Sequence, residues 1–450
     1  MDETDLSGAS REALLALIGE LRAGLVERDA LIAELQKRIG ALEERLGGRG
    51  GPGMPGHKAP PAKPKPPPQA RKKRAHGFGR ARMSPTTTVA HAVDSCPDCG
   101  TRLVGGWVQR TRQVLELPIQ PVEVVEHQYV ARECPLCGKR HVPRVELDGV
   151  VLGQRHRLGV RLVSRIVTLR EEGRLPLATI QWYLATVHGL HLSVGELVGV
   201  VQAVAKRATP ALAQIQAAVQ ESPVVHADET GWREKGVNGY VWTFSTPTER
   251  YFTRGKRSKE VVDAALGPTF SGTLVSDFYA AYHHYPGVHQ RCWAHLLRDI
   301  HDLKEVYPTD AGLADWAAVV LALYKEGVAF VGSDETARLA KQRELEGRLG
   351  AACQPFATDP LAVQAKLCRR IARHLTELFV FVGDPRVPAT NNAAERSLRH
   401  LVTSRKISGG TQSAAGTTSK TALASLFGTW RVQGLNPLDQ CLHLLQSPHQ

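Results

Sequence analysis

Three acidic residues stand where predicted strands end or a predicted helix begins. The runs 224–228 and 273–277 are typical of short buried strands, and each ends on a carboxylate, Asp228 and Asp277. If these strands are neighbours in one sheet, the two carboxylates lie side by side and repel each other unless a divalent cation sits between them. Glu395, at the start of a predicted helix, supplies a third acid. Three such acids predict a site for two Mg²⁺ or Mn²⁺ ions, which would activate a water or a 3′-hydroxyl for attack on a phosphodiester.

The segments around these acids follow the order of a ribonuclease-H-like α/β core. Three strands lead, and a crossover helix and two further strands follow. The predicted strands are 224–228, 239–245, 250–254, 273–277 and 288–292, with helices at 258–266 and 293–303. The 117 residues between Asp277 and Glu395 are too many for one crossover. Their helical patterns, at 313–324, 335–349 and 361–379, predict an α-helical insertion inside the core.

Four cysteines form two CxxCG turns with 34 residues between them: Cys96, Cys99, Cys134 and Cys137. Each turn aims two thiolates at one point, and together they complete a tetrahedral site suited to a structural Zn²⁺. Residues 114–119 and 122–130 alternate enough to supply short strands, so the stretch predicts a zinc ribbon. Disulfides are the alternative, but the other four cysteines are scattered and nothing indicates export.

A helical region is predicted from residue 155 to 220. Ser193 can cap a helix that runs to Ala205, after a break at His188–Leu190. The pattern fits a helix-turn-helix whose second helix could enter a major groove of DNA, and it fits a plain helical bundle nearly as well.

The positive charge of the chain is concentrated in one segment. The 450 residues include 57 Lys or Arg and 44 Asp or Glu, a net charge of +13. Ten of the basic residues and no acidic one lie between Arg49 and Val93, in a stretch rich in Pro and Gly. Such a segment predicts an extended linker that contacts a phosphate backbone without reading sequence; a solvated spacer is the alternative. Its densest run is Arg71, Lys72, Lys73 and Arg74.

The N-terminal segment has a helical repeat. Apolar residues recur at steps of three and four from Leu14 to Leu46, interrupted on this seam by Arg28. A 3.5-residue repeat of this length predicts a coiled coil and a homo-oligomer, with an amphipathic helix docked on its own chain as the alternative. No apolar run approaches the roughly 18–20 residues that span a membrane. The acidic start, Met1–Asp5, lacks the features of a secretory signal, so we expect a cytoplasmic protein.

Several stretches together resemble transposases of the insertion sequence 66 family, members of the DDE class. They are His226–Thr230, Ser276–Tyr282, Cys292–His295, Asn391–Arg399, Arg405–Lys406 and Gly434–Pro437. The order of parts along the chain matches as well. The resemblance implies a ribonuclease-H-like core in which Asp228, Asp277 and Glu395 form the catalytic, metal-binding triad. The chain departs from the family pattern at Thr390, where an acid is usual, and over Ile407–Gly416, where aromatic residues are more usual.

Other residues near the triad have more than one interpretation. Four basic side chains follow Glu395 and suit phosphate contacts, with a solvated helix face as the alternative: Arg396, Arg399, Arg405 and Lys406. Glu229 should point away from the metal bound by Asp228, because strand side chains alternate, and is expected to form hydrogen bonds. Cys292 and His295 resemble a Cys-x-x-His element of several transposases, and we interpret the pair as packing rather than as metal ligands.

The sequence therefore predicts seven segments and one main function. The segments are a coiled coil (11–47), a basic linker (48–92), a zinc ribbon (93–145), a helical DNA-binding-like region (155–220), the first part of the core (221–305), a helical insertion (306–385), and the last part of the core with C-terminal helices (386–446). By resemblance, the protein is expected to bind the ends of a DNA element, cleave phosphodiesters and transfer 3′ ends to target DNA, with accessory proteins of the same element as further partners. A nuclease without strand transfer and a catalytically silent DNA-binding regulator are the alternatives.

Overall fold

The computed structural model describes residues 82–115, 117, 122–144, 150–152, 156–332 and 334–446. The predicted coiled coil at 11–47 and most of the linker, with Arg71–Arg74, lie outside these residues. The chain divides into two compact units, Met1–Glu116 and Leu117–Gln450, and each is described by itself.

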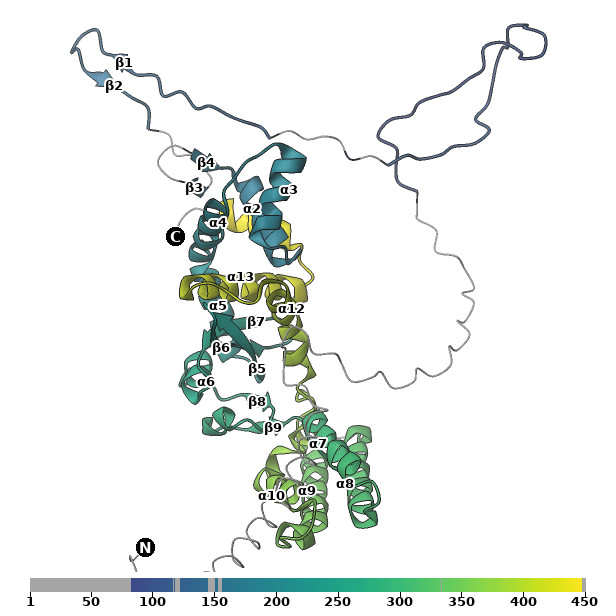
Figure 1. Ribbon diagram of the computed structural model, residues 1–450, viewed down its shortest axis with the longest axis vertical. Helices are drawn as coiled ribbons and strands as arrows, with labels where there is room; N and C mark the ends of the chain where they lie inside the picture. Colours follow the sequence, from purple (N-terminus) through teal and green to yellow (C-terminus); the bar gives the residue numbers. More distant parts are fainter. Residues whose placement is uncertain are drawn as a thin grey trace, which may run out of the picture. The chain divides into compact units, whose positions relative to one another are not determined.

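A five-stranded mixed sheet organises the second unit (Figure 1). In sheet order its strands are β7 (Arg250–Gly255), β6 (Val237–Ser245), β5 (Val224–Glu234), β8 (Thr273–Ser276) and β9 (His289–Arg291). The first three strands pair antiparallel. Strand β8 pairs parallel to β5, and β9 pairs parallel to β8. Helix α6 (Lys259–Leu266) connects β7 to β8. This mixed α/β arrangement is consistent with the predicted ribonuclease-H-like core.

Strand β5 is longer than its sequence suggested. The prediction ended it at Asp228, but it continues to Glu234 because its second half pairs antiparallel with β6, up to Glu234 opposite Val237. Only its first three residues, Val224–His226, pair with β8. Residues 228–234 are mostly polar, so the hydrophobicity pattern did not predict that the strand continues through them.

Both faces of the sheet are covered. On one face Trp242 and Phe244 pack with Leu266 of α6. On the other face Trp232, Val241 and Phe252 of the strands pack against Leu398 and Leu401, and also against Ala424. The helices of this second face are α12 (Asn392–Ser408) and α13 (Ala414–Val432). The alternation of Val241, Trp242 and Phe244 between the faces is the two-residue period of a strand.

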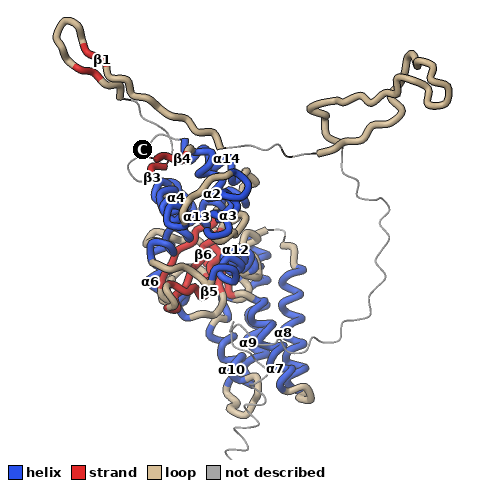
Figure 2. The backbone as a smooth tube through the Cα atoms, turned by 45° about the horizontal axis from the view of Figure 1, so that its top comes forward, coloured by secondary structure: helices blue, strands red, loops and turns tan. Residues whose placement is uncertain are grey.

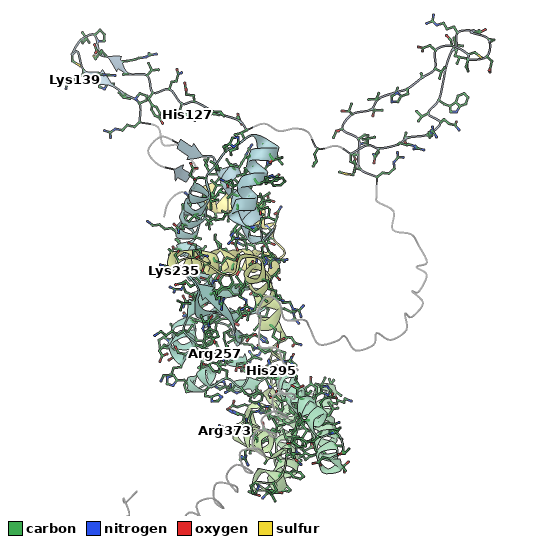
Figure 3. All side chains as sticks on the ribbon, viewed as in Figure 1. His127, Lys139, Lys235, Arg257, His295 and Arg373 are labelled. Carbon is green, nitrogen blue, oxygen red and sulfur yellow. The ribbon has the colours of Figure 1, made fainter. Side chains whose placement is uncertain are left out.

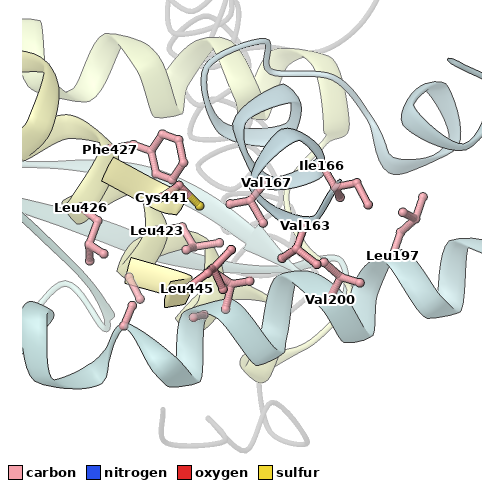
Figure 4. Close-up of a cluster of buried hydrophobic side chains, with 14 of the residues drawn as sticks. Val163, Ile166, Val167, Leu197, Val200, Leu423, Leu426, Phe427, Cys441 and Leu445 are labelled. Atoms are coloured by element: carbon pink, nitrogen blue, oxygen red, sulfur yellow. The ribbon is translucent and has the colours of Figure 1, made fainter. Parts of the chain in front are cut away.

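The helical region and the C-terminus share a hydrophobic core (Figure 4). Helix α13 contributes to it together with α2 (Val160–Glu171), α3 (Leu177–His188), α4 (Val194–Arg207), α5 (Thr209–Gln220) and α14 (Pro437–Gln446). Val167, Val200, Leu423, Phe427 and Leu445 are among its buried members. The predicted helix break is confirmed, since Gly189 adopts a left-handed conformation. Ser193 caps α4 in a reciprocal capping box with Glu196.

The insertion, predicted at 306–385, folds around its own core, which includes Trp316, Leu345 and Phe379. Helix α7, which the prediction assigned to the first part of the catalytic core, adds Leu296 to this cluster and is described with the insertion. The helices are α7 (Trp293–Val306), α8 (Ala311–Ala329), α9 (Glu335–Ala357), α10 (Ala365–Arg373) and α11 (Val380–Gly383). Helices α7, α8, α9 and α10 lie side by side in Figure 2. The helix predicted at 361–379 is shorter, because the chain leaves the α-helix at Arg373 and forms a 3-10 turn at Leu375–Glu377.

The region around the cysteines has less regular structure than predicted. Short hairpins form from β1 (Arg132–Glu133) with β2 (Arg140–His141), and from β3 (Val150–Leu152) with β4 (His156–Leu158). The strands predicted at 122–130, and at the described residues of 114–119, are absent. Their apolar side chains are exposed and have no sheet to pack against, as at Val114 and Val124. Among the described residues, no helix is long and apolar enough to cross a membrane.

Candidate active site

The pairing of β5 with β8 places Asp228, inside β5, and Asp277, directly after β8, at equivalent positions. The two strands are parallel, with His226 opposite Val275, so the acids follow two residues further along each chain. Glu395 lies in the first turn of α12, and α12 packs on β5. The structure therefore brings together the three acids singled out in the sequence.

The electrostatics of Asp228 show that the charges of the other acids act on it. Burial raises the pKa of Asp228 to about 7, and the negative charges of Glu229, Asp277 and Glu395 add to the rise. One contact acts in the opposite direction, because the backbone N–H of Glu229 donates to the Asp228 carboxylate at 2.9 Å. The cluster is short of positive charge, and a divalent cation would supply it.

The donor set fits a hard divalent cation in its chemistry. Carboxylate oxygens are the ligands that Mg²⁺ and Mn²⁺ prefer. Within the described ranges, however, no group of three or more His, Cys, Asp and Glu side chains is arranged to hold a metal ion. The three acids therefore offer suitable donor atoms, and their charges act on one another, without the arrangement of a formed metal site.

Asn391 fastens the start of the Glu395 helix to the sheet. Its Nδ2 donates to the carbonyl of Ala227 at 2.7 Å, and its Oδ1 accepts from Nδ1 of His226 at 3.1 Å. Its backbone N–H donates to Sγ of Cys292 at 3.1 Å, and its carbonyl accepts from the N–H of Glu395 at 3.3 Å. Burial keeps His226 neutral by lowering its pKa to about 4. Sequence reasoning quoted Asn391 only as part of a motif and missed this positioning contact.

Two further contacts hold α12 along the sheet. Oγ of Ser397 pairs with Oγ of Ser245 at 3.0 Å. Nη1 of Arg405 donates to Oγ1 of Thr230 at 3.0 Å and to the carbonyl of Gly231. Arg405, expected to contact DNA, thus has partners inside the protein, whereas Arg396, Arg399 and Lys406 are exposed.

Glu229 forms hydrogen bonds, as its position in the strand suggested. Oη of Tyr282 donates to its carboxylate at 2.6 Å, and Arg257 forms an ion pair with it at 2.8 Å. The Arg257 guanidinium also lies over the ring of Tyr279, 3.9 Å from its centroid. Burial raises the pKa of Glu229, and the charge of Asp277 contributes to that rise.

His295 lies next to the acids, a placement that a packing interpretation did not anticipate. Its Nε2 is 3.8 Å from Oε1 of Glu395. The Cys292 side chain and the charges of Asp277 and Glu395 raise the pKa of His295, so its protonated form is favoured. Figure 3 labels His295 near the start of the insertion. The available signal was the three-residue step from Cys292, which puts both residues on one side of the helix start.

Each cysteine turn forms a tight hairpin in its own unit. The N–H of Gly100 donates to the carbonyl of Cys96, and that of Gly138 to the carbonyl of Cys134, both at 2.9 Å. Both glycines have positive φ, 73° and 66°. The Thr101 hydroxyl lowers the pKa of Cys99, and the amides of Cys137 and Leu136 lower that of Cys134. Lowered thiol pKa values favour the thiolates that a metal would bind.

Comparison with known proteins identifies the family. The model of the transposase IS66 family matches residues 155–419, more than half of the chain. The chain belongs to that family. The match includes the sheet, the insertion and helix α12 with Glu395, and so contains all three acids.

Two curated relatives come from Sinorhizobium fredii. The uncharacterized protein y4jO is 39% identical over 71 residues, which are 16% of this chain and 22% of the relative. The uncharacterized protein y4qI is 25% identical over 254 residues, 49% of this chain and 47% of the relative. The chain thus spans less than half the length of either relative.

Proposed function

We propose that the protein is a DNA transposase that cleaves phosphodiesters at the ends of a DNA element and transfers the 3′ ends to target DNA. The observation that carries this proposal is the register of β5 with β8, in which Asp228 and Asp277 take equivalent positions on neighbouring strands, together with the action of the Asp277 and Glu395 charges on Asp228. Membership of the transposase family supports it.

In this proposal the three carboxylates are the ligands of divalent metal ions. Bound Mg²⁺ or Mn²⁺ would activate the attacking oxygen and stabilise the leaving one. Asn391 keeps Glu395 beside β5, because it ties the helix start to Ala227 and His226. The neighbouring acids raise the pKa of His295, and a proton on this imidazole would offset part of the repulsion among them beside Glu395.

The DNA contacts are proposed from exposed basic side chains. Arg396 and Arg399 lie three residues apart on α12 and are exposed close to Glu395, and Lys406 is exposed near the end of the helix. Arg71–Arg74 are proposed as a further phosphate-contacting run, and the 11–47 segment as the element that joins protomers. Binding of DNA through such groups weakens steeply as salt rises.

A strand-transfer assay tests the catalytic proposal. Labelled element ends with Mg²⁺ should yield both nicked ends and joined products with the native chain. Asp277→Asn should lower both by roughly 10³-fold or more, because it removes a charged ligand with little change of shape. Asp302→Asn, on the exposed side of α7, is the matched control and should leave both unchanged. Unchanged cleavage by Asp277→Asn would refute the triad, and cleavage without joining would show a nuclease.

A structural Zn²⁺ held by Cys96, Cys99, Cys134 and Cys137 is proposed from their spacing. The hairpin form of each turn and the lowered pKa values of Cys99 and Cys134 support it. Metal analysis of the purified protein should find about one zinc per chain. Cys134→Ser should lose that zinc, while Cys441→Ser, at a buried cysteine of α14, should retain it. Equal zinc in both variants would remove the proposal.

A further inference from the structure

The outer face of helix α8 is exposed along its whole length. Leu313, Trp316 and Val320 turn into the core of the insertion. The opposite side presents residues at alternating steps of four and three: Ala311, Asp315, Ala318, Ala322, Lys325 and Ala329, all exposed. We call these six residues the α8 seam. Such a spacing is that of a coiled-coil interface.

Larger apolar side chains border the α8 seam. Val319, Leu321 and Val328 are 46%, 38% and 57% exposed. A helix that is apolar on its outer side as well as its inner side normally has a partner on both. Among the described residues, the buried side of α8 packs in the core of the insertion, with contacts to α7 and α9. Figure 2 shows α8 beside these two helices.

Two opposite charges interrupt the α8 seam, at Asp315 and Lys325. Neither side chain forms a hydrogen bond or ion pair with any residue in the described part of the chain. The neighbouring Glu326, which lies off the seam, is in contrast bound by Lys341 and Arg348. The seam charges are therefore available to a partner.

The α8 seam is self-complementary when it is inverted. Positions 315 and 325 are equally distant from position 320, as are 318 and 322, and 311 and 329. We propose that α8 pairs antiparallel with α8 of a second copy of this chain. In that pairing Asp315 meets Lys325 of the second copy twice, once on each side of a two-fold axis, and every other layer joins alanine to alanine.

The charges also decide the orientation of the pair. A parallel pairing would oppose Asp315 to Asp315 and Lys325 to Lys325, and such like charges repel. Antiparallel pairing converts both contacts into attractive ones. Alanine in the remaining layers lets the helix axes approach to about 8 Å, where the flanking Val319, Leu321 and Val328 become covered.

A pair of single helices makes a small interface. It buries less than the roughly 1,000 Å² of a stable complex, so the pairing is expected to be weak by itself. A second association between the same chains would strengthen it by raising the effective concentration of one helix near the other. The inference does not depend on the proposed catalytic function.

A zero-length cross-link tests this pairing directly. A carbodiimide joins a carboxylate to an amine only where the two already touch. Along one helix Asp315 and Lys325 are about 15 Å apart, so an amide between them must join two chains. Full-length chains labelled with ¹⁴N and ¹⁵N are mixed, cross-linked and digested, and an Asp315–Lys325 peptide of mixed label is expected by mass spectrometry. If this peptide is absent at chain concentrations up to roughly 100 µM, the proposal is overturned, whether the preparation is associated or monomeric.

Charge reversal sharpens the test. Asp315→Lys and Lys325→Asp should each lose the cross-link and weaken self-association by about tenfold, because both contacts become repulsive. Mixed together, these two variants should associate again and give a cross-link between position 315 of one chain and position 325 of a differently labelled chain. Glu305→Lys and Lys366→Asp, exposed on α7 and α10, are the matched controls and should leave the native cross-link unchanged. Failure of the mixed variants to associate also overturns the proposal.

Discussion

Helix α12 is anchored at two places by different kinds of buried contact. Near its start, Asn391 is neutral, and its side chain is bound to His226 and to Ala227. Near its middle, Nδ1 of His400 accepts from Nε of Arg174 at 3.2 Å. His400 also lies beside an ion pair between Glu171 of α2 and Lys420 of α13, 2.7 Å apart, whose side chains are 1% and 4% exposed.

The second anchor is incompletely paired. Four buried atoms of the elements that meet there have no hydrogen-bond partner among the described residues: Oγ1 of Thr168, Oε1 of Glu171, Nε2 of His400 and Oγ of Ser404. The two contacts thus have different structural roles. Asn391, whose side-chain oxygen and nitrogen are both hydrogen-bonded, fixes the start of α12 and with it Glu395. The Glu171–Lys420 pair joins α2 to α13 beside His400, and its incomplete hydrogen bonding makes that junction sensitive to charge.

Removing one charge of the second anchor should give the largest loss of stability. Lys420→Met leaves the Glu171 carboxylate buried without its partner, which should lower the free energy of unfolding by about 3–5 kcal/mol. The double variant Glu171→Met, Lys420→Met should recover most of that loss, because an apolar pair of similar size needs no partner. Urea unfolding measures both. A double variant as unstable as the single one would contradict this account.

Breaking the neutral anchor should cost less stability and more activity. Asn391→Ala leaves the buried Nδ1–H of His226 and the carbonyl of Ala227 without hydrogen-bond partners, which should lower the free energy of unfolding by about 2–3 kcal/mol. Because Glu395 loses its fixed position, cleavage should fall about 10²-fold. Asn238→Ala, at an exposed asparagine of β6, is the control and should change neither. If the variant lost stability but kept full cleavage activity, Asn391 would not be needed to position Glu395.

The charged anchor should also make the protein acid-sensitive. Burial and the charges of Lys420, Arg431 and Arg174 lower the pKa of His400 to about 3, from an ordinary value of 6.5. Between these values the unfolded chain binds a proton that the folded chain does not, so stability falls as pH falls from about 6.5 towards 3. His400→Gln should therefore reduce the loss of unfolding free energy between pH 7 and pH 5 by about 2 kcal/mol. An unchanged pH dependence would refute this role.

The smallest effect is expected at the exposed side of the site. Arg257 pairs with Glu229, but its side chain is 43% exposed, so solvent screens the pair. Arg257→Ala should lower the free energy of unfolding by less than about 1 kcal/mol. Thermal unfolding of Arg257→Ala beside Arg254→Ala, at a similarly exposed arginine of β7 paired with Glu234, provides the comparison. A loss as large as that of Asn391→Ala would place Arg257 among the anchors.

Local patterns predicted the frame of the site. Apolar runs ending at Asp228 and Asp277 indicated two strands, and the capping pair Ser193 and Glu196 indicated where α4 begins. These signals lie within a few residues of the feature they predict, so a single sequence contains them.

Long-range contacts were beyond such patterns. Lys420 stands among Thr and Ser in α13 and resembles a surface residue, yet its partner is 249 positions away. The placement of His295 beside Glu395 and of Asn391 against β5 likewise depends on how the insertion returns to the core. The added length of β5 depends on its pairing with β6, which the polar run 229–234 does not reveal.

The insertion leaves and rejoins the core at one point. The N–H of Trp293, its first residue, donates to the carbonyl of Ala389 at 3.0 Å, and Cys292 accepts from Asn391 immediately beside it. A segment whose ends meet in this way, around a core of its own, behaves as an exchangeable module. Its helices can be lengthened, shortened or replaced by evolution or by design while the strand ends and Glu395 keep their places.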